Sequence, residues 1–68
     1  MTIGEKLVAL REDPSQKEVA EALGISQSAL CQYETDERVP RDEIKVRLSN
    51  YYGVSVQNLF YANEGHVS

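Results

Sequence analysis

A single residue, Ile25, separates a glycine from a serine near the middle of the chain, and this joint restricts the possible folds more than any other feature. Glycine adopts positive φ without a steric penalty and is favoured just past the end of a helix, so Gly24 predicts where one helix ends. Ser26 is a favoured N-cap residue and predicts where the next helix begins. Two helices joined this tightly must cross steeply, which predicts a rigid helical pair.

The region before this joint divides into two predicted helices. Apolar residues at helical spacing predict a first helix over about residues 2–12. It ends ahead of Pro14, because the residue before a proline disfavours helical backbone. Ser15 stands three residues before Glu18, a capping-box pattern that predicts a second helix starting near Gln16.

The region after the joint predicts three more helices. A third helix covers residues 27–34, and the polar residues 35–39 form a loop that leaves Pro40 suited to the first turn of a fourth helix. Ser55 can cap a short final helix. The apolar positions of these last two helices are Ile44, Leu48, Tyr51, Tyr52, Val56, Leu59 and Phe60. The expected fold is an all-α, compact five-helix bundle, a single domain over residues 1–62 with a frayed tail at 63–68.

The chain is poor in residues that perform chemistry. Its one cysteine, Cys31, cannot close an internal disulfide, and its one histidine, His66, cannot build a metal cluster. Neither has a visible catalytic partner, so we expect no enzyme activity, no cofactor and no small-molecule ligand. The longest apolar run, residues 7–10, is far shorter than the roughly 20 residues that cross a bilayer, so we expect a cytoplasmic protein without a membrane partner.

Residues 16–34, QKEVAEALGISQSALCQYE, supply the parts of a helix-turn-helix. Such a motif needs a small residue where its helices cross, here Ala20, a glycine at the turn, here Gly24, and apolar residues that fix the angle. The apolar residues are Val19, Leu23, Ile25, Leu30 and Tyr33. A plain helical hairpin with a glycine linker shares this spacing, so spacing alone leaves both alternatives open.

The same segment closely resembles the phage repressor and Cro family of helix-turn-helix proteins. Other family segments follow in the same order: Leu10-Arg11-Glu12, Ser15-Gln16-Lys17-Glu18-Val19-Ala20, Tyr33-Glu34 and Gly53-Val54-Ser55. The resemblance covers nearly the whole chain and implies a lambda-repressor-like domain of an XRE-like transcriptional regulator, usually a repressor. It also implies that Arg11 pairs with Glu34 inside the fold. Two loops depart from the family pattern: the link from Arg11 to Gln16 is shorter, and Thr35-Asp36-Glu37 replaces the usual glycine.

The resemblance further implies that Gln27, Ser28 and Gln32 on the third helix face the major groove of a double-stranded DNA operator. The chemistry agrees, because glutamine pairs with adenine N6 and N7 and serine can donate or accept. The alternative is that these side chains only solvate an outward helix face. Cys31 lies beside them and is interpreted as a small neutral contact, since no basic neighbour is present to make it a redox sensor.

Phosphate contacts are expected at the two ends of the motif. By resemblance Gln16 contacts a phosphate and braces Gln27, and the nearby cations and the cap of the third helix are the other candidates. The full set is Gln16, Lys17, Ser26, Arg38 and Arg41. The overall field opposes this role, because the net charge is -4 and residues 1–40 carry four basic against eight acidic side chains. Backbone N–H groups at the heads of the second and third helices partly compensate, so we expect modest, salt-dependent affinity.

Family members usually bind as two-fold dimers, so a homodimer is expected here too. The expected interface is aromatic and C-terminal, formed by Tyr51, Tyr52, Phe60 and Tyr61, although these residues could instead complete the core. A different function remains open, in which the same fold binds another protein, as an anti-repressor or antitoxin-like partner does. The acidic residues that would form that contact are Glu5, Glu12, Glu18 and Glu21.

Overall fold

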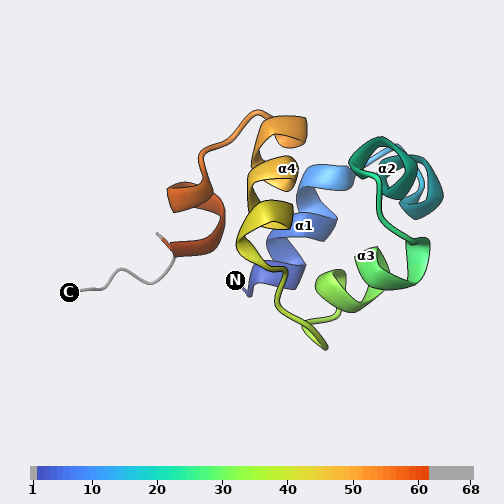
Figure 1. The fold of residues 1–68 in the computed structure, drawn as a ribbon, viewed down its shortest axis with the longest axis horizontal. Helices are drawn as coiled ribbons and strands as arrows, with labels where there is room; N and C mark the ends of the chain where they lie inside the picture. Colours follow the sequence, from blue (N-terminus) through green and yellow to red (C-terminus); the bar gives the residue numbers. More distant parts are fainter. Residues whose placement is uncertain (1, 62–68) are drawn as a thin grey trace.

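The computed structural model describes residues 2–61, which form four α-helices followed by one π-helical segment and contain no strand (Figure 1). The elements are α1 (Ile3–Arg11), α2 (Gln16–Leu23), α3 (Gln27–Glu34), α4 (Asp42–Tyr52) and η1 (Gln57–Tyr61). The predicted all-α, five-helix fold is confirmed, with a last helix of π type. The tail predicted at 63–68, with His66, lies outside the described residues. No helix within residues 2–61 is long and apolar enough to cross a membrane.

Side-chain caps begin the first three helices. The Thr2 hydroxyl accepts from the Glu5 N–H, and the Glu5 carboxylate accepts in return from the Thr2 N–H. Ser15 caps α2 by accepting from the Glu18 N–H, and Ser26 caps α3 in the same way. The complete capping box therefore belongs to α1, whereas α2 shows only the half that Ser15 supplies.

The core contains one fully buried aliphatic side chain from each α-helix. Leu7 of α1, Val19 of α2, Leu30 of α3 and Leu48 of α4 are all 0% exposed. Leu59 and Phe60 of η1 complete this cluster. Burial of such a side chain contributes about 1.5–3 kcal/mol, so these few residues provide much of the stability that a chain of this size can gain.

The helices pack so that α2 and α3 lie together at one end of the molecule, with η1 at the opposite end (Figure 1). Helix α3 packs against both α1 and α2, α4 packs against α2, and η1 packs against α1. The helical pair of the motif is therefore supported from behind by the rest of the bundle and presents its outer side to solvent.

The start of α4 differs from the prediction. Pro40 was expected in the first turn, but the helix begins at Asp42 and Arg41 is its N-cap, without a side-chain hydrogen bond. The carboxylates Asp42 and Glu43 occupy the first turn instead, where their negative charges interact favourably with the positive end of the helix dipole. Pro40 is buried ahead of the helix and ends the preceding loop.

Candidate nucleic-acid interface

The joint between α2 and α3 has the geometry that its sequence predicts. Gly24 adopts the left-handed conformation with φ 75°, which only glycine occupies without strain. Its N–H reaches back to the carbonyls of Ala20 and Glu21, and the Ile25 N–H donates to the Ala20 carbonyl at 3.0 Å. Ala20 itself is buried, as expected of the small residue at the crossing. These backbone hydrogen bonds close the end of α2 and set the turn, and α2 then packs against α3.

Helix α3 divides cleanly into two sides. Leu30 and Tyr33 are buried, whereas Gln27, Ser28 and Cys31 are exposed. Gln32 is half-buried at the edge of the exposed side. The side chains predicted to read bases therefore share one outward stripe of α3, and Cys31 lies within that stripe.

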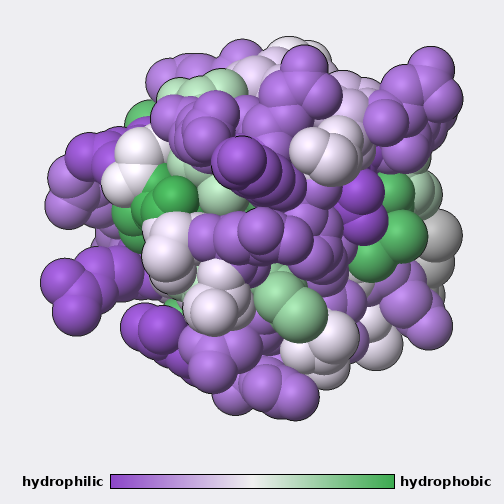
Figure 2. Space-filling view, turned by 90° about the vertical axis from the view of Figure 1, so that its right-hand side faces the viewer, coloured by the Kyte–Doolittle hydropathy of each residue, from purple (hydrophilic) through white to green (hydrophobic). Residues whose placement is uncertain are grey.

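The end of the molecule that carries α2 and α3 is hydrophilic over most of its surface, with only small apolar patches (Figure 2). A polar surface is suited to hydrogen bonds with base edges and phosphates. Within residues 2–61 no group of three or more histidine, cysteine, aspartate or glutamate side chains is placed to hold a metal ion.

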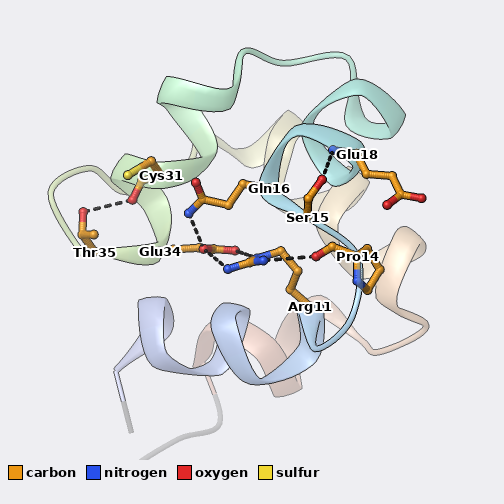
Figure 3. Close-up of polar contacts among 8 residues, drawn as sticks. All are labelled: Arg11, Pro14, Ser15, Gln16, Glu18, Cys31, Glu34 and Thr35. Carbon is orange, nitrogen blue, oxygen red and sulfur yellow. Dashed lines mark hydrogen bonds and ion pairs between the residues drawn. The ribbon is translucent and has the colours of Figure 1, made fainter.

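The structure brings Arg11 and Glu34 together. Arg11 Nε donates to Glu34 Oε2 at 2.7 Å, and Arg11 Nη2 donates to Oε1 at 3.1 Å, which makes a bidentate pair (Figure 3). The Glu34 side chain is only 2% exposed and that of Arg11 is 20% exposed. Hydrogen bonding to Glu34 raises the pKa of the Arg11 guanidinium above its ordinary value. The pair ties the end of α1 to the end of α3.

Gln16 joins this pair at the head of α2. Its Nε2 donates to Glu34 Oε1 at 2.8 Å, so the carboxylate lies between the guanidinium and the amide (Figure 3). The hydrogen bond that the structure shows for the Gln16 amide goes to Glu34, and the contact with Gln27 stays a prediction. The buried carboxylate of Glu34 thereby links α1, α2 and α3.

The other phosphate candidates lie on the surface around the motif. Lys17, Ser26, Arg38 and Arg41 are all exposed. Ser26 Oγ accepts from the Ala29 N–H at 3.0 Å, which leaves its hydroxyl hydrogen free to donate outward. Arg38 is more constrained, since its guanidinium contacts Gln32 and the Tyr33 ring.

Comparison with known proteins decides the family. A family model described as helix-turn-helix matches residues 9–59, three quarters of the chain. The chain belongs to the helix-turn-helix family. The resemblance seen in the sequence is thereby confirmed.

Individual relatives agree with this assignment. The HTH-type transcriptional regulator ImmR of Bacillus subtilis (strain 168) is 38% identical over 66 residues, covering 94% of this chain and 52% of ImmR. The helix-turn-helix chain thus spans about half the length of this curated relative.

Solved structures extend the similarity to the fold. The P22 c2 repressor, solved in complex with a synthetic operator, aligns with a TM-score of 0.87 at 26% identity over 93% of this chain and 98% of its own. The SOS-response transcriptional repressor LexA from Eubacterium rectale aligns with a TM-score of 0.82 over 97% of this chain and 72% of its own. At 18% identity, the LexA alignment shows the fold alone.

Local backbone conformation accommodates the two loops that depart from the family pattern. Glu12 ends α1 with φ 47°, and Arg11 Nη1 donates to the Pro14 carbonyl at 3.1 Å, so the short link to α2 leaves Arg11 in reach of Glu34. After α3, Asp36 takes the left-handed conformation with φ 66° at the loop that lacks a glycine. Aspartate tolerates this conformation better than most residues, because its short polar side chain forms local hydrogen bonds.

Sequence reasoning missed the contact between this loop and α1. The Asp36 carboxylate accepts from the Gly4 N–H, and Gly4 packs so closely on Glu34 that a Cβ there would clash with the Glu34 carbonyl. The only signal in the sequence was a glycine in the first turn of a helix, where glycine is otherwise unfavourable.

The C-terminal aromatic residues divide into two groups. Phe60 is in the core and Tyr52 is half-buried, whereas Tyr51 and Tyr61 are 42% and 54% exposed. The Tyr52 hydroxyl is buried and has no hydrogen-bond partner within residues 2–61. Burial, with a smaller contribution from the Glu34 charge, raises the pKa of Tyr52 to about 12. Half of the aromatic set expected at a dimer interface therefore packs within the monomer.

Proposed function

We propose that this helix-turn-helix domain is a sequence-specific DNA-binding transcriptional regulator, a repressor that reads the major groove with α3. The observation that carries the proposal is the outward stripe of uncharged polar side chains on α3, held rigidly by the buried Glu34 network behind it. A helix whose position is fixed before binding loses little conformational entropy on binding, which favours specific readout.

The relatives support this proposal. ImmR is an HTH-type transcriptional regulator, and the P22 c2 repressor is seen with an operator. The structural alignment with the P22 c2 repressor covers 93% of this chain and therefore includes both helices of the motif. We assign base contacts to Gln27, Ser28 and Gln32, and phosphate contacts to a set around them. That set is Gln16, Lys17, Ser26, Arg38 and Arg41.

Charge limits the affinity of the domain. A net charge of -4 opposes the approach to DNA, so binding depends on cations placed beside α3 and on the N–H groups at the heads of α2 and α3. Both helix heads are capped by serine, which adds hydroxyl donors at the same places. We infer that a monomer binds weakly and that two copies act together on a near-palindromic site.

The copies of this proposed dimer meet through the exposed tyrosines Tyr51 and Tyr61, the two C-terminal aromatic residues that do not complete the core. Sedimentation velocity on the protein with and without its operator tests this assignment. Tyr51→Ser combined with Tyr61→Ser is expected to lower dimer formation, whereas Val39→Ser, an exposed apolar residue in the loop before α4, is the control. Equal dimer formation in both variants would show that other residues form the dimer interface.

The experiment that tests the function is selection of binding sites from random duplex DNA. We expect recovery of a near-palindromic sequence whose half-sites lie about one helical turn apart. Recovery of no preferred sequence, with binding that depends only on salt, would contradict sequence-specific regulation. The acidic surface formed by Glu5, Glu12, Glu18 and Glu21 would then be the candidate contact for a protein partner.

A further inference from the structure

The loop after α3 folds back and holds one cation against a predicted base-reading side chain. The Arg38 N–H donates to the Gln32 carbonyl at 3.2 Å, and Arg38 Nη1 donates to Gln32 Oε1, also at 3.2 Å. The Arg38 guanidinium carbon also lies 5.7 Å from the centre of the Tyr33 ring, within the range of a cation–π contact. Arg38 thus contacts α3 through its backbone N–H and through its guanidinium group.

These contacts fix which end of the Gln32 amide is free. A guanidinium has donors and no acceptor, so only the amide oxygen can face Arg38. The Nε2 group, with its two donors, is consequently turned away from Arg38.

We propose that Arg38 is a specificity-determining residue that orients Gln32 to donate to a guanine. This inference rests on the proposed function. Guanine presents two acceptors in the major groove, N7 and O6, whereas adenine presents one acceptor and one donor. An amide whose oxygen is held by Arg38 matches the guanine edge, and a free amide matches the adenine edge. The contact made by Gln32 therefore differs from the adenine contact that the sequence alone suggested.

Arg41 provides a matched control for the loss of charge. It is exposed, it follows Arg38 in the same loop region, and its side chain makes no hydrogen bond or ion pair with another described residue. Removing Arg41 should weaken DNA binding without changing base preference, because its contribution is electrostatic. Removing Arg38 takes away the same charge and also releases Gln32.

The test compares base preference in the parent protein, Arg38→Met, Arg41→Met, Gln32→Ala and the double variant Arg38→Met with Gln32→Ala. Each is used to select sites from random duplex DNA, and affinities are then measured on duplexes that differ at one base pair. In the parent we expect a guanine at one position whose preference disappears in Gln32→Ala. Arg38→Met should shift that position from guanine toward adenine by about three- to tenfold, and Arg41→Met should leave it unchanged. In the double variant, Arg38→Met should cause no further change at that position.

A second measurement reports on the amide without DNA. The side-chain NH₂ signals of Gln32 in an NMR spectrum of labelled protein should move in Arg38→Met and not in Arg41→Met. Unmoved signals together with an unchanged guanine preference would overturn the role of Arg38 and leave the proposed function intact. A parent protein that selects no DNA sequence would overturn both.

Discussion

The carboxylate of Asp36 accepts a hydrogen bond from the Gly4 N–H at 2.9 Å, across 32 positions of sequence. The bond occupies one of the N–H groups that the first turn of α1 leaves without a helical partner. It also attaches the loop after α3 to the head of α1, beside the close contact of Gly4 with the Glu34 carbonyl. The end of the proposed recognition helix and the start of the loop after it are therefore both anchored to α1, through Glu34 and Asp36.

Position 36 needs a hydrogen-bond acceptor and a residue that tolerates positive φ. Substitutions of Asp36 are expected to separate these two properties. An asparagine would keep an acceptor and tolerate positive φ, so Asp36→Asn should change the free energy of unfolding only slightly. Asp36→Ala loses the hydrogen bond and strains the left-handed backbone, which together should cost about 2–3 kcal/mol. Asp36→Gly loses only the hydrogen bond and should fall between them. Urea unfolding measures the order, and equal stability of the alanine and asparagine variants would contradict this account.

Arg11 and Glu34 should respond unequally to substitution. Arg11→Met leaves a carboxylate that is 2% exposed with only the Gln16 amide, and breaking such a buried pair typically costs about 3–5 kcal/mol. Glu34→Leu should cost less, because the Arg11 side chain is 20% exposed and its guanidinium can reach water. The double variant should be milder than Arg11→Met alone. A urea-unfolding cycle with a coupling energy near zero would contradict an energetic role for the pair.

Tyr52→Phe should increase stability at alkaline pH. Because the folded-state pKa of Tyr52 is raised to about 12 from an ordinary value of 10.0, the unfolded chain loses this proton first. The contribution of Tyr52 is then fully present below pH 10 and is lost as pH rises toward 12. Near pH 7 the phenylalanine variant should be equally or slightly more stable, since it removes a buried hydroxyl that has no hydrogen-bond partner in the described part of the chain. Thermal unfolding between pH 7 and 12 tests this, with Tyr51→Phe as the exposed control.

Gln27→Ala and Gln32→Ala should each weaken binding to the selected operator by about 1–3 kcal/mol. The free energy of unfolding should change little, because Gln27 is exposed and Gln32 lies at the edge of the solvent-facing side. Affinity is measured on the selected duplex and on an unrelated duplex of equal length. If both variants bound the selected site as tightly as the parent, the base contacts would lie on other residues.

Lys17→Ala and Arg41→Ala should weaken specific and non-specific binding alike. Each removes one exposed cation, so the slope of log binding constant against log salt concentration should fall by about one per residue. Val39→Ala, an exposed and uncharged position in the same region as Arg41, should leave the slope unchanged. If the slope stayed at the parent value in one of these two variants, the cation removed in that variant would not contact a DNA phosphate.

The local features of this protein can be predicted from its sequence. Ser15, Ser26 and Gly24 act within a few residues of where they stand, and the helix boundaries that depend on them lie where capping and positive φ require. The apolar spacing that selects Leu7, Leu30 and the other core residues is likewise local, because one face of each helix must be buried. Together with the order of family segments, these features were enough to predict the all-α fold and the helix-turn-helix.

Contacts between residues far apart in the chain depend on how the helices pack. The Asp36 bond to Gly4, the choice of Glu34 by the Gln16 amide, and the burial of Phe60 all depend on which helices become neighbours. A hydrogen-bonding side chain has no preferred partner until packing sets the distances and excludes water. The same reason explains Arg38, which the sequence offers only as a cation near the motif. The loop geometry after α3 turns it toward Gln32 and Tyr33.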